Sequence, residues 1–312
     1  MSSLKTLAAQ FEDGRTDREG FWRTMQQRHR QLHEYQELIS GTDLDSICIC
    51  DRELRVQTRE GVWMVWDPGD MGTAPNVLVN RGRYEPTEGA YLLEAGSGAH
   101  VIFDVGANIG YYSLHWALRM APGGTIHAFE PVPSTFAWFV RNIALNGLDA
   151  VIRPNAIGLG DAPGVVSLFL PEFLGSGAAS IKDLHPDEGT RRVEVKLDTL
   201  DNYFSASGLD RLDLIKVDVE GAELLVLRGG RETIAKHRPM IFLELLRKWS
   251  RPFGYHPNDV IQMLTGMGYR CTTFDNSRLI PFELMTEETP QKNFFFAHPD
   301  VHREWLSAQD LV

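Results

Sequence analysis

Short apolar runs alternate with amphipathic stretches between residues 101 and 158. The runs at 101–103 and 126–129 are rich in β-branched and aromatic side chains and predict buried strands. Apolar residues recur at helical spacing over 112–118 and 136–144, and a third strand is predicted within 150–158. This alternation predicts an α/β fold with a doubly wound parallel sheet, in which ligands bind beyond the carboxyl ends of the strands.

The first of these strands ends in a glycine turn. The stretch VIFDVGANIGYYS, residues 101–113, places Asp104 at the strand end, and Gly106, Asn108 and Gly110 follow before a helix begins. Such a turn exposes backbone N–H groups at a helix N-terminus, and its glycines admit a ligand close to the main chain. The turn therefore predicts a nucleotide or nucleoside site, with a purely structural glycine turn as the alternative.

Two cofactor classes compete for this turn. Dinucleotide enzymes use G-x-G-x-x-G, because the pyrophosphate needs a bare backbone at the second glycine. Here Asn108 fills that position, and Asp104 would bring a carboxylate near the anion. The tail of S-adenosylmethionine carries an ammonium and a sulfonium group, which an acidic residue attracts. The turn thus favours S-adenosylmethionine over a dinucleotide.

The next two strands add polar groups at the same edge. Glu130 ends the second strand, twenty residues after Gly110. Both cofactor classes use a carboxylate there to accept hydrogen bonds from the ribose hydroxyls, so Glu130 supports a nucleoside without choosing between them. The third strand delivers Asn155 and Ala156 to this edge.

Several segments occur in one order between residues 80 and 298: VIFDVGANIGYYSL, HAFEPVPSTFAWFVRNIALN, LDTLDNYF, LDLIKVDVEGAELLVLRGG, RPMIFLEL and NFFFAHP. Together they resemble the FkbM-type S-adenosylmethionine-dependent methyltransferases. The resemblance implies a class I methyltransferase sheet of seven mostly parallel strands, the last one antiparallel. It also implies O-methylation of a small-molecule hydroxyl, in a secondary metabolite or a sugar, with S-adenosylhomocysteine as product. The candidate cofactor-binding residues are Tyr84, Asp104, Gly106, Ala107, Asn108, Gly110, Glu130, Pro131, Asn155 and Ala156.

Catalytic candidates follow the predicted strand at 214–217. Asp218 stands at its carboxyl end, and an alcohol acceptor needs a base because an unactivated hydroxyl is a poor nucleophile. Asp218 is the first candidate as base or hydroxyl orienter, and Glu220, Glu244 and His256 complete the set. Three alternatives stay open for these acids: stabilisation of a helix dipole, a Mg²⁺ site that we do not favour, and pairing of Glu244 with the buried Lys216. No metal ligand is assigned.

The segment between 171 and 189, PEFLGSGAASIKDLHPDEG, is loop-like and lies between two predicted strands. Loops of this length are more often functional than not, so we expect it to border the acceptor pocket. Its polar candidates are Ser176, Ser180 and His185, and a solvated loop would carry the same residues.

Residues 1–80 are predicted to form an extension to a methyltransferase domain at 81–312. A helix opens at a capping box of Thr16 and Glu19, and an alternating pattern over 46–70 predicts a small antiparallel sheet. The helix is interpreted as packed on its own domain, as a substrate lid or as an arm of a homodimer. In the approach segment RGRYEPTE, Tyr84 or Glu88 closes over the cofactor, or else Tyr84 packs and Glu88 starts a helix.

Net charge, apolar runs and cysteine content limit the classes of partner and the location that we expect. The formal charge of −11 argues against nucleic acid, which binds a basic face. There is no apolar run of about 18 residues and no signal-peptide pattern, so we expect a cytoplasmic protein without a membrane partner. Cys48, Cys50 and Cys271 are expected to be reduced and packed rather than metal-bound. Two other hypotheses stay open: an NAD-dependent oxidoreductase, and a non-catalytic regulator that binds S-adenosylmethionine.

Overall fold

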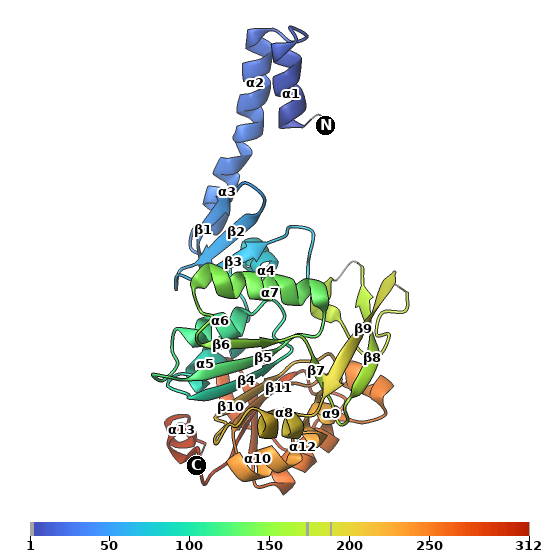
Figure 1. The fold of residues 1–312 in the computed structure, drawn as a ribbon. Coiled ribbons are helices and arrows are strands. Elements are labelled where there is room, and N and C mark those ends of the chain that lie inside the picture. Colours follow the sequence, from blue (N-terminus) through green and yellow to red (C-terminus); the bar gives the residue numbers. More distant parts are fainter. Residues whose placement is uncertain (1–2, 173–174, 188, 312) are drawn as a thin grey trace.

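The computed structural model describes residues 3–172, 175–187 and 189–311. Its centre is an eight-stranded sheet in the order β13-β12-β14-β11-β10-β4-β5-β6 (Figure 1). The strands from β6 to β11 pair in parallel, whereas β14 is antiparallel to both of its neighbours. The strands are β4 (Val101–Val105), β5 (Thr125–Phe129), β6 (Ile152–Asn155), β10 (Leu214–Val217), β11 (Met240–Glu244), β12 (Arg270–Asp275), β13 (Arg278–Pro281) and β14 (Asn293–Ala297).

The α/β class, the mostly parallel sheet and the antiparallel last strand are confirmed, but the predicted count of seven strands is wrong for the main sheet. After β12 the chain reverses at Asn276 and Ser277, which have positive φ angles of 44° and 66°. It then pairs back on β12 as β13. A tight reversal of this kind adds an eighth strand at the sheet edge.

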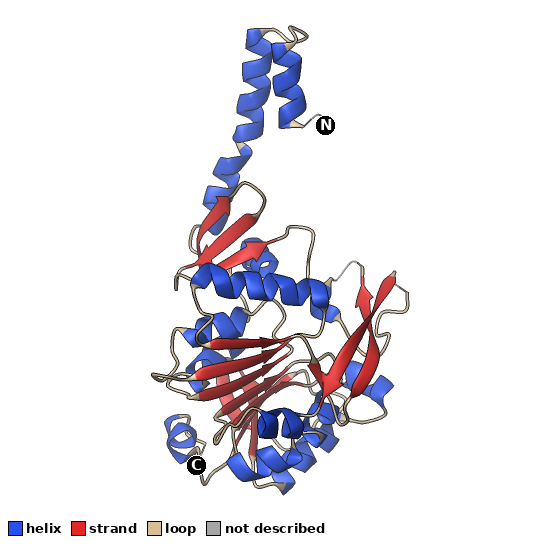
Figure 2. Cartoon of the chain, in the orientation of Figure 1, coloured by secondary structure: helices blue, strands red, loops and turns tan. Residues whose placement is uncertain are grey.

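Helices cover both faces of the sheet (Figure 2). Because side chains alternate along a strand, Ile102 enters the core cluster on one face and Phe103 the cluster on the other. Both side chains are fully buried. The helices of the body are α4 (Ala74–Arg81), α5 (Glu88–Ala95), α6 (Tyr111–Ala117), α7 (Pro133–Asn146), α8 (Leu200–Ala206), α9 (Glu223–Arg228), α10 (Arg231–His237), α11 (Arg247–Ser250), α12 (Pro257–Gly266) and α13 (Arg303–Ala308), with 3₁₀ turns η1 (Ser176–Ala178) and η2 (Arg251–Phe253).

A second sheet of order β7-β9-β8 stands beside the main one (Figure 1). It comprises β7 (Gly158–Leu159), β8 (Gly164–Pro171) and β9 (Thr190–Asp198). The two predicted strands that flank the long loop are therefore confirmed as an antiparallel hairpin. A bridge between Phe169 and Ser180 folds part of that loop back onto β8.

The N-terminal extension contains α1 (Leu4–Glu12), α2 (Arg18–His29), α3 (Gln31–Ile39) and an antiparallel sheet of β1 (Leu44–Ile49), β2 (Leu54–Thr58) and β3 (Trp63–Trp66). The predicted small sheet is confirmed. Asp17, not Thr16, caps α2, because its carboxylate accepts the N–H of Gly20 at 2.7 Å.

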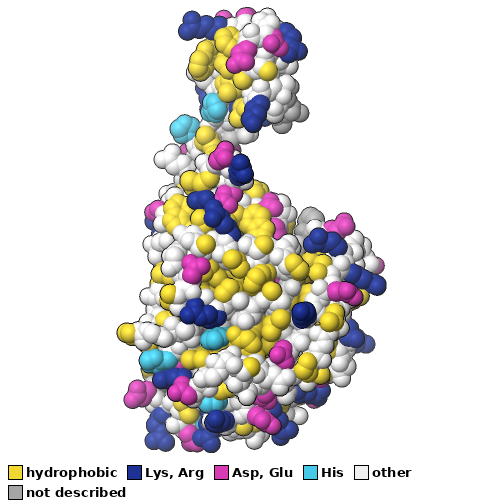
Figure 3. All heavy atoms as spheres, in the orientation of Figure 1, with side chains coloured by type: hydrophobic (Ala, Val, Ile, Leu, Met, Phe, Trp, Pro, Cys, Tyr) yellow, Lys and Arg dark blue, Asp and Glu magenta, His cyan; other side chains and the backbone are white. Residues whose placement is uncertain are grey.

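The α1–α2 hairpin projects from the body as an arm (Figure 1). None of the residues of α1, α2 or α3 is buried, and Trp22 is 54% exposed. Hydrophobic side chains lie open on the arm and on the body beneath it (Figure 3). Packing on its own domain is thus wrong for the part of the predicted helix that forms α2, and the substrate lid and the dimer arm stay predictions.

The N-terminal sheet is tied to the glycine turn through α7. The Asn142 side chain accepts the N–H of Val65 at 2.8 Å and donates to the carbonyl of Ile109 at 2.9 Å. Since Asn142 is fully buried, these two bonds replace water that the polar groups have lost. The extension therefore helps to hold the turn in place.

Three further sequence predictions concern the cysteines, membrane-spanning segments and the domain boundary. Cys48, Cys50 and Cys271 are free cysteines, and the sulfurs of Cys48 and Cys50 lie 3.4 Å apart. Within the described ranges, no helix is both long and apolar enough to span a membrane. The domain boundary at residues 80 and 81 falls at the end of α4 and stays a prediction.

Candidate functional site

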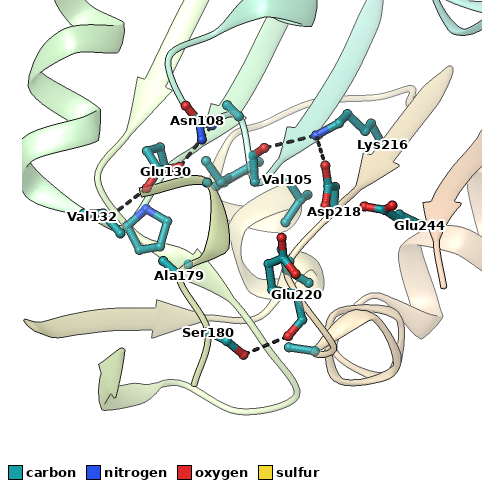
Figure 4. Close-up of a pocket in the computed structure, with 18 of the residues that line it drawn as sticks. Val105, Asn108, Glu130, Val132, Ala179, Ser180, Lys216, Asp218, Glu220 and Glu244 are labelled. Carbon is teal, nitrogen blue, oxygen red and sulfur yellow. Dashed lines mark hydrogen bonds and ion pairs between the residues drawn. The ribbon is translucent and has the colours of Figure 1, made fainter. Parts of the chain in front are cut away.

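A pocket opens at the carboxyl ends of the parallel strands β4, β5, β10 and β11 (Figure 4). This is the edge at which doubly wound sheets bind ligands. Nine of the fourteen predicted site residues line the pocket: Tyr84, Gly106, Ala107, Asn108, Glu130, Pro131, Asp218, Glu220 and Glu244.

The glycine turn is fixed by close backbone packing. Gly106 has a φ of +80°, and a Cβ atom there would lie 1.9 Å from the carbonyl oxygen of Asp218. Its N–H and that of Ala107 donate to the carbonyl of Phe129 at 3.1 and 3.0 Å. Gly110, with a φ of +91°, lies against the Phe139 ring and does not line the pocket. Gly106 is thus needed to bring the ends of β4 and β10 together, and Gly110 to pack α6 on α7.

Glu130 is held by main-chain donors. Its Oε2 accepts the N–H of Asn108 at 3.0 Å, and its Oε1 accepts the N–H of Val132 at 2.8 Å (Figure 4). The side chain is buried, and burial raises the pKa of Glu130 to about 7. The carboxyl group is therefore fixed in position, and it becomes ionised as the pH rises through about 7.

Asp104 does not line the pocket, so the structure does not give it the predicted contact with the cofactor. It is 1% exposed, accepts the hydroxyl of Ser113 at 2.6 Å and lies 3.5 Å from the Lys216 ammonium group. Lys216 also lies 3.5 Å from Asp218 and donates to the Gly106 carbonyl at 3.0 Å. Register explains the arrangement, because Asp104 and Lys216 are paired across β4 and β10. Asp104 therefore influences the pocket only indirectly, by holding Lys216 beside Asp218.

The surroundings of Lys216 also shift its pKa. Burial by itself would lower the pKa of Lys216, but the charges of Asp218 and Asp104 raise it to about 12. Lys216 is thus a fixed cation that holds Asp218 at the pocket. The expected pairing of Lys216 with Glu244 is wrong, because Glu244 pairs with Lys292 at 2.6 Å.

Two further carboxyl groups stand beside Asp218 (Figure 4). Burial, with the charges of Asp218 and Glu244, raises the pKa of Glu220 to about 10. Burial and the charge of Asp218 raise the pKa of Glu244 to about 7. At neutral pH Glu220 therefore keeps its proton, whereas Glu244 is present in both its protonated and its ionised form.

Glu223, the first residue of α9, has a structural role. Its carboxylate accepts the N–H of Gly221 at 3.1 Å and the hydroxyl of Tyr255 at 3.0 Å. It does not line the pocket. Glu223 thus shapes the segment that carries Glu220, whose own φ is +53°.

Three other candidates lie away from the pocket. His256 caps α12, with its Nδ1 accepting the N–H of Asn258 at 3.1 Å, so the structure gives it no place beside the acids. The Asn155 side chain donates to the carbonyls of Arg153 and Ala128 at 2.9 and 3.3 Å, and Ala156 is exposed. Asn155 is the last residue of β6 and Ala156 follows it, one strand beyond the strands that border the pocket.

The long loop reaches the pocket at one of its three polar candidates. Ser180 lines it and donates to the carbonyl of Glu220 at 2.8 Å (Figure 4). His185 does not line it, and the side chain of Ser176 lies outside the described part of the chain. The loop thus borders the carboxylate side of the pocket through Ser180.

Among the lining residues with polar side chains, four were not predicted as site residues: Glu85, Tyr111, Tyr112 and Lys216. The Tyr112 hydroxyl donates to Glu85, while Glu88, named as a lid candidate, does not line the pocket. The helical period placed Tyr112 on the apolar face of α6, but only the tertiary packing shows that this face borders the pocket. Among the described residues, no group of three or more His, Cys, Asp or Glu is arranged to hold a metal.

Comparisons with known proteins agree with this geometry. A family model described as the methyltransferase FkbM domain matches residues 104–271. Methyltransferase sdnD of Sordaria araneosa is 32% identical over 197 residues, which cover 55% of this chain and 74% of that protein. Methyltransferase 1 of Beauveria bassiana is 36% identical over 144 residues, covering 41% of this chain and 57% of that protein.

A bacterial relative carries a more specific name. The 31-O-demethyl-FK506 methyltransferase FkbM of Streptomyces tacrolimicus is 29% identical over 160 residues, covering 41% of this chain and 58% of that protein. The chain thus spans somewhat over half the length of the Beauveria and Streptomyces proteins.

Proposed function

The chain belongs to the FkbM methyltransferase family, and from this we propose that it is an S-adenosylmethionine-dependent O-methyltransferase acting on a hydroxyl of a small molecule. One observation carries the proposal. A single pocket joins Glu130, fixed after β5, to the carboxyl groups of Asp218 and Glu244 after β10 and β11. A nucleoside and an acceptor hydroxyl would thus lie on neighbouring strand ends.

The donor set fits the cofactor. Apolar side chains of Phe129, Val132 and Leu159 line the pocket near Glu130 and suit a purine ring, while the Glu130 carboxylate suits the ribose hydroxyls. The acids at the other end suit a cationic tail. When bound, S-adenosylmethionine supplies an activated methyl group.

The residues of the chain act on the acceptor. Asp218, held by Lys216, accepts a hydrogen bond from the hydroxyl and orients it (Figure 4). Glu244 takes the hydroxyl proton, because its pKa of about 7 matches the requirement of a general base at neutral pH. Glu220 is protonated and donates a hydrogen bond within the pocket. Asp218 is in this scheme an orienting group.

The name of the Streptomyces relative supports transfer to oxygen, because its substrate is a compound that lacks a methyl group on an oxygen. The overall charge of −11 supports a small acceptor rather than a nucleic acid.

The test is transfer of an isotopically labelled methyl group. Purified protein is incubated with methyl-labelled S-adenosylmethionine and a panel of neutral sugars and polyhydroxylated metabolites, and products are analysed by mass spectrometry and NMR. Label on an acceptor oxygen supports the proposal. Label on nitrogen or carbon contradicts O-methylation, and cofactor binding without turnover of any acceptor favours a regulator.

A further inference from the structure

Glu85 is a carboxylate in the pocket that the proposed chemistry does not yet use. It lies between α4 and α5 and lines the pocket beside Tyr84 and Tyr112. Its φ of +43° lies in the left-handed region, which a side chain other than glycine rarely adopts without a structural or functional requirement. The Tyr112 hydroxyl donates to one of its oxygens, Oε2. The carboxylate is thus positioned by packing rather than free to move.

Among the described residues, no ion pair includes Glu85, so its carboxyl group has no cationic partner there. Two lysines are near, and both are engaged elsewhere. Lys216 lies 3.5 Å from Asp218, and Lys292 lies 2.6 Å from Glu244. Lys216 also lies 3.5 Å from Asp104, so the two lysines already face three carboxylates before Glu85 is counted, and a bound cation would balance the charge of Glu85.

The sheet order tells which part of a nucleoside ligand would reach Glu85. The ribose end is fixed by Glu130 after β5, and the glycine turn after β4 separates β5 from β10. Adjacent strands are about 4.8 Å apart, so a tail that crosses the turn arrives about two strand spacings from β5. Glu85 contacts Tyr112 in the first turn of α6, which directly follows the glycine turn. It therefore stands on the tail side.

A main-chain acceptor on this side is already used. The carbonyl of Gly106 accepts the Lys216 ammonium group at 3.0 Å, and Asp104 is buried beneath it. Asp104 therefore does not reach the pocket as the sequence suggested, and one of the two lone pairs of the Gly106 carbonyl oxygen is occupied. Oε1 of Glu85 accepts no hydrogen bond from a described residue.

We propose that Glu85 binds the α-ammonium group of the cofactor's amino-acid tail. This inference rests on the proposed function, because it assumes that S-adenosylmethionine occupies the pocket. Glu85 takes the role that the sequence assigned to Asp104, and it is a binding residue rather than a base.

The test compares two ligands that share the nucleoside. S-adenosylhomocysteine has the amino-acid tail, and 5′-methylthioadenosine lacks it. The variant Glu85→Gln keeps an oxygen for the Tyr112 hydroxyl but removes the charge. We expect calorimetric titration to show S-adenosylhomocysteine binding about 10- to 100-fold more weakly, as for loss of a hydrogen bond between charged groups, and unchanged binding of 5′-methylthioadenosine.

Glu88→Gln is the matched control, because Glu88 is close in sequence but does not line the pocket. It should bind both ligands as the wild type does. Equal loss of both ligands in Glu85→Gln, or loss of neither, would overturn the ammonium contact. Failure of the wild type to bind S-adenosylhomocysteine would instead overturn the proposed function, and the inference with it.

Discussion

Replacing Lys216 with methionine should destabilise the protein strongly, because it removes the only cation paired with Asp104 among the described residues. Asp104 is 1% exposed, and Lys216 is 4% exposed. Breaking a buried ion pair by deleting one partner typically costs about 3–5 kcal/mol, since the other charge stays buried. Asp104 retains its hydrogen bond from Ser113, so we expect about 3 kcal/mol at pH 8.

The loss of stability in Lys216→Met should depend on pH. In the wild type the pKa of Lys216, about 12, lies above the ordinary lysine value, so the pairing contributes fully below about pH 10 and is lost as pH rises toward 12. In Lys216→Met the charge of Asp104 stays buried without a cation beside it, and desolvation favours the neutral form of the carboxyl group. Protonation then favours folding, and the loss of stability should be smaller at pH 5.5 than at pH 8.

The assay is urea unfolding of the wild type and the variants at both pH values. The double variant Asp104→Asn with Lys216→Met carries neither charge and should recover at least half of the lost free energy of unfolding. Arg23→Met serves as control, because Arg23 pairs with Glu19 on the exposed arm and should change nothing measurable. A loss below about 1 kcal/mol in Lys216→Met, or no recovery in the double variant, would show that the buried pair does not stabilise the fold in this way.

Three further predictions concern the pocket. Gly106→Ala should abolish S-adenosylhomocysteine binding and lower the melting temperature, because the new Cβ would lie 1.9 Å from the Asp218 carbonyl; Gly147→Ala, at a positive φ in open space, should keep binding. Because the pKa of Glu130 is about 7 and the ribose hydroxyls need its ionised form, affinity for S-adenosylhomocysteine should fall about tenfold from pH 8 to pH 6, and calorimetry of Glu130→Gln should show no such slope. At saturating cofactor, kcat should fall below pH 7 with the protonation of Glu244, and Glu244→Gln should lower kcat about 10²- to 10⁴-fold and remove that limb; an unchanged pH profile would exclude Glu244 as the base.

Local pattern predicted the strand ends well. Apolar runs stop where a charged or turn-forming residue must leave the sheet, and so β4, β5, β6 and β10 and their carboxyl ends could be located. Because ligand groups in such a sheet gather at one edge, most of the predicted cofactor residues line the pocket.

What failed depends on contacts between distant segments. Asp104 and Lys216 are 112 residues apart in the chain and meet only through the pairing of β4 with β10. No local pattern shows that Asp104 is neutralised there, or that Glu85 reaches the pocket. The start of α2 could not be predicted either, because Thr16 and Asp17 are both good N-cap residues and only the folded backbone selects Asp17.

The proposed cofactor is tested most directly by calorimetric titration of the purified protein with S-adenosylhomocysteine and, separately, with NAD⁺. We expect binding of S-adenosylhomocysteine that Glu130→Ala loses, and no binding of NAD⁺. Binding of NAD⁺ without S-adenosylhomocysteine would contradict the proposed cofactor and assign the pocket to an oxidoreductase.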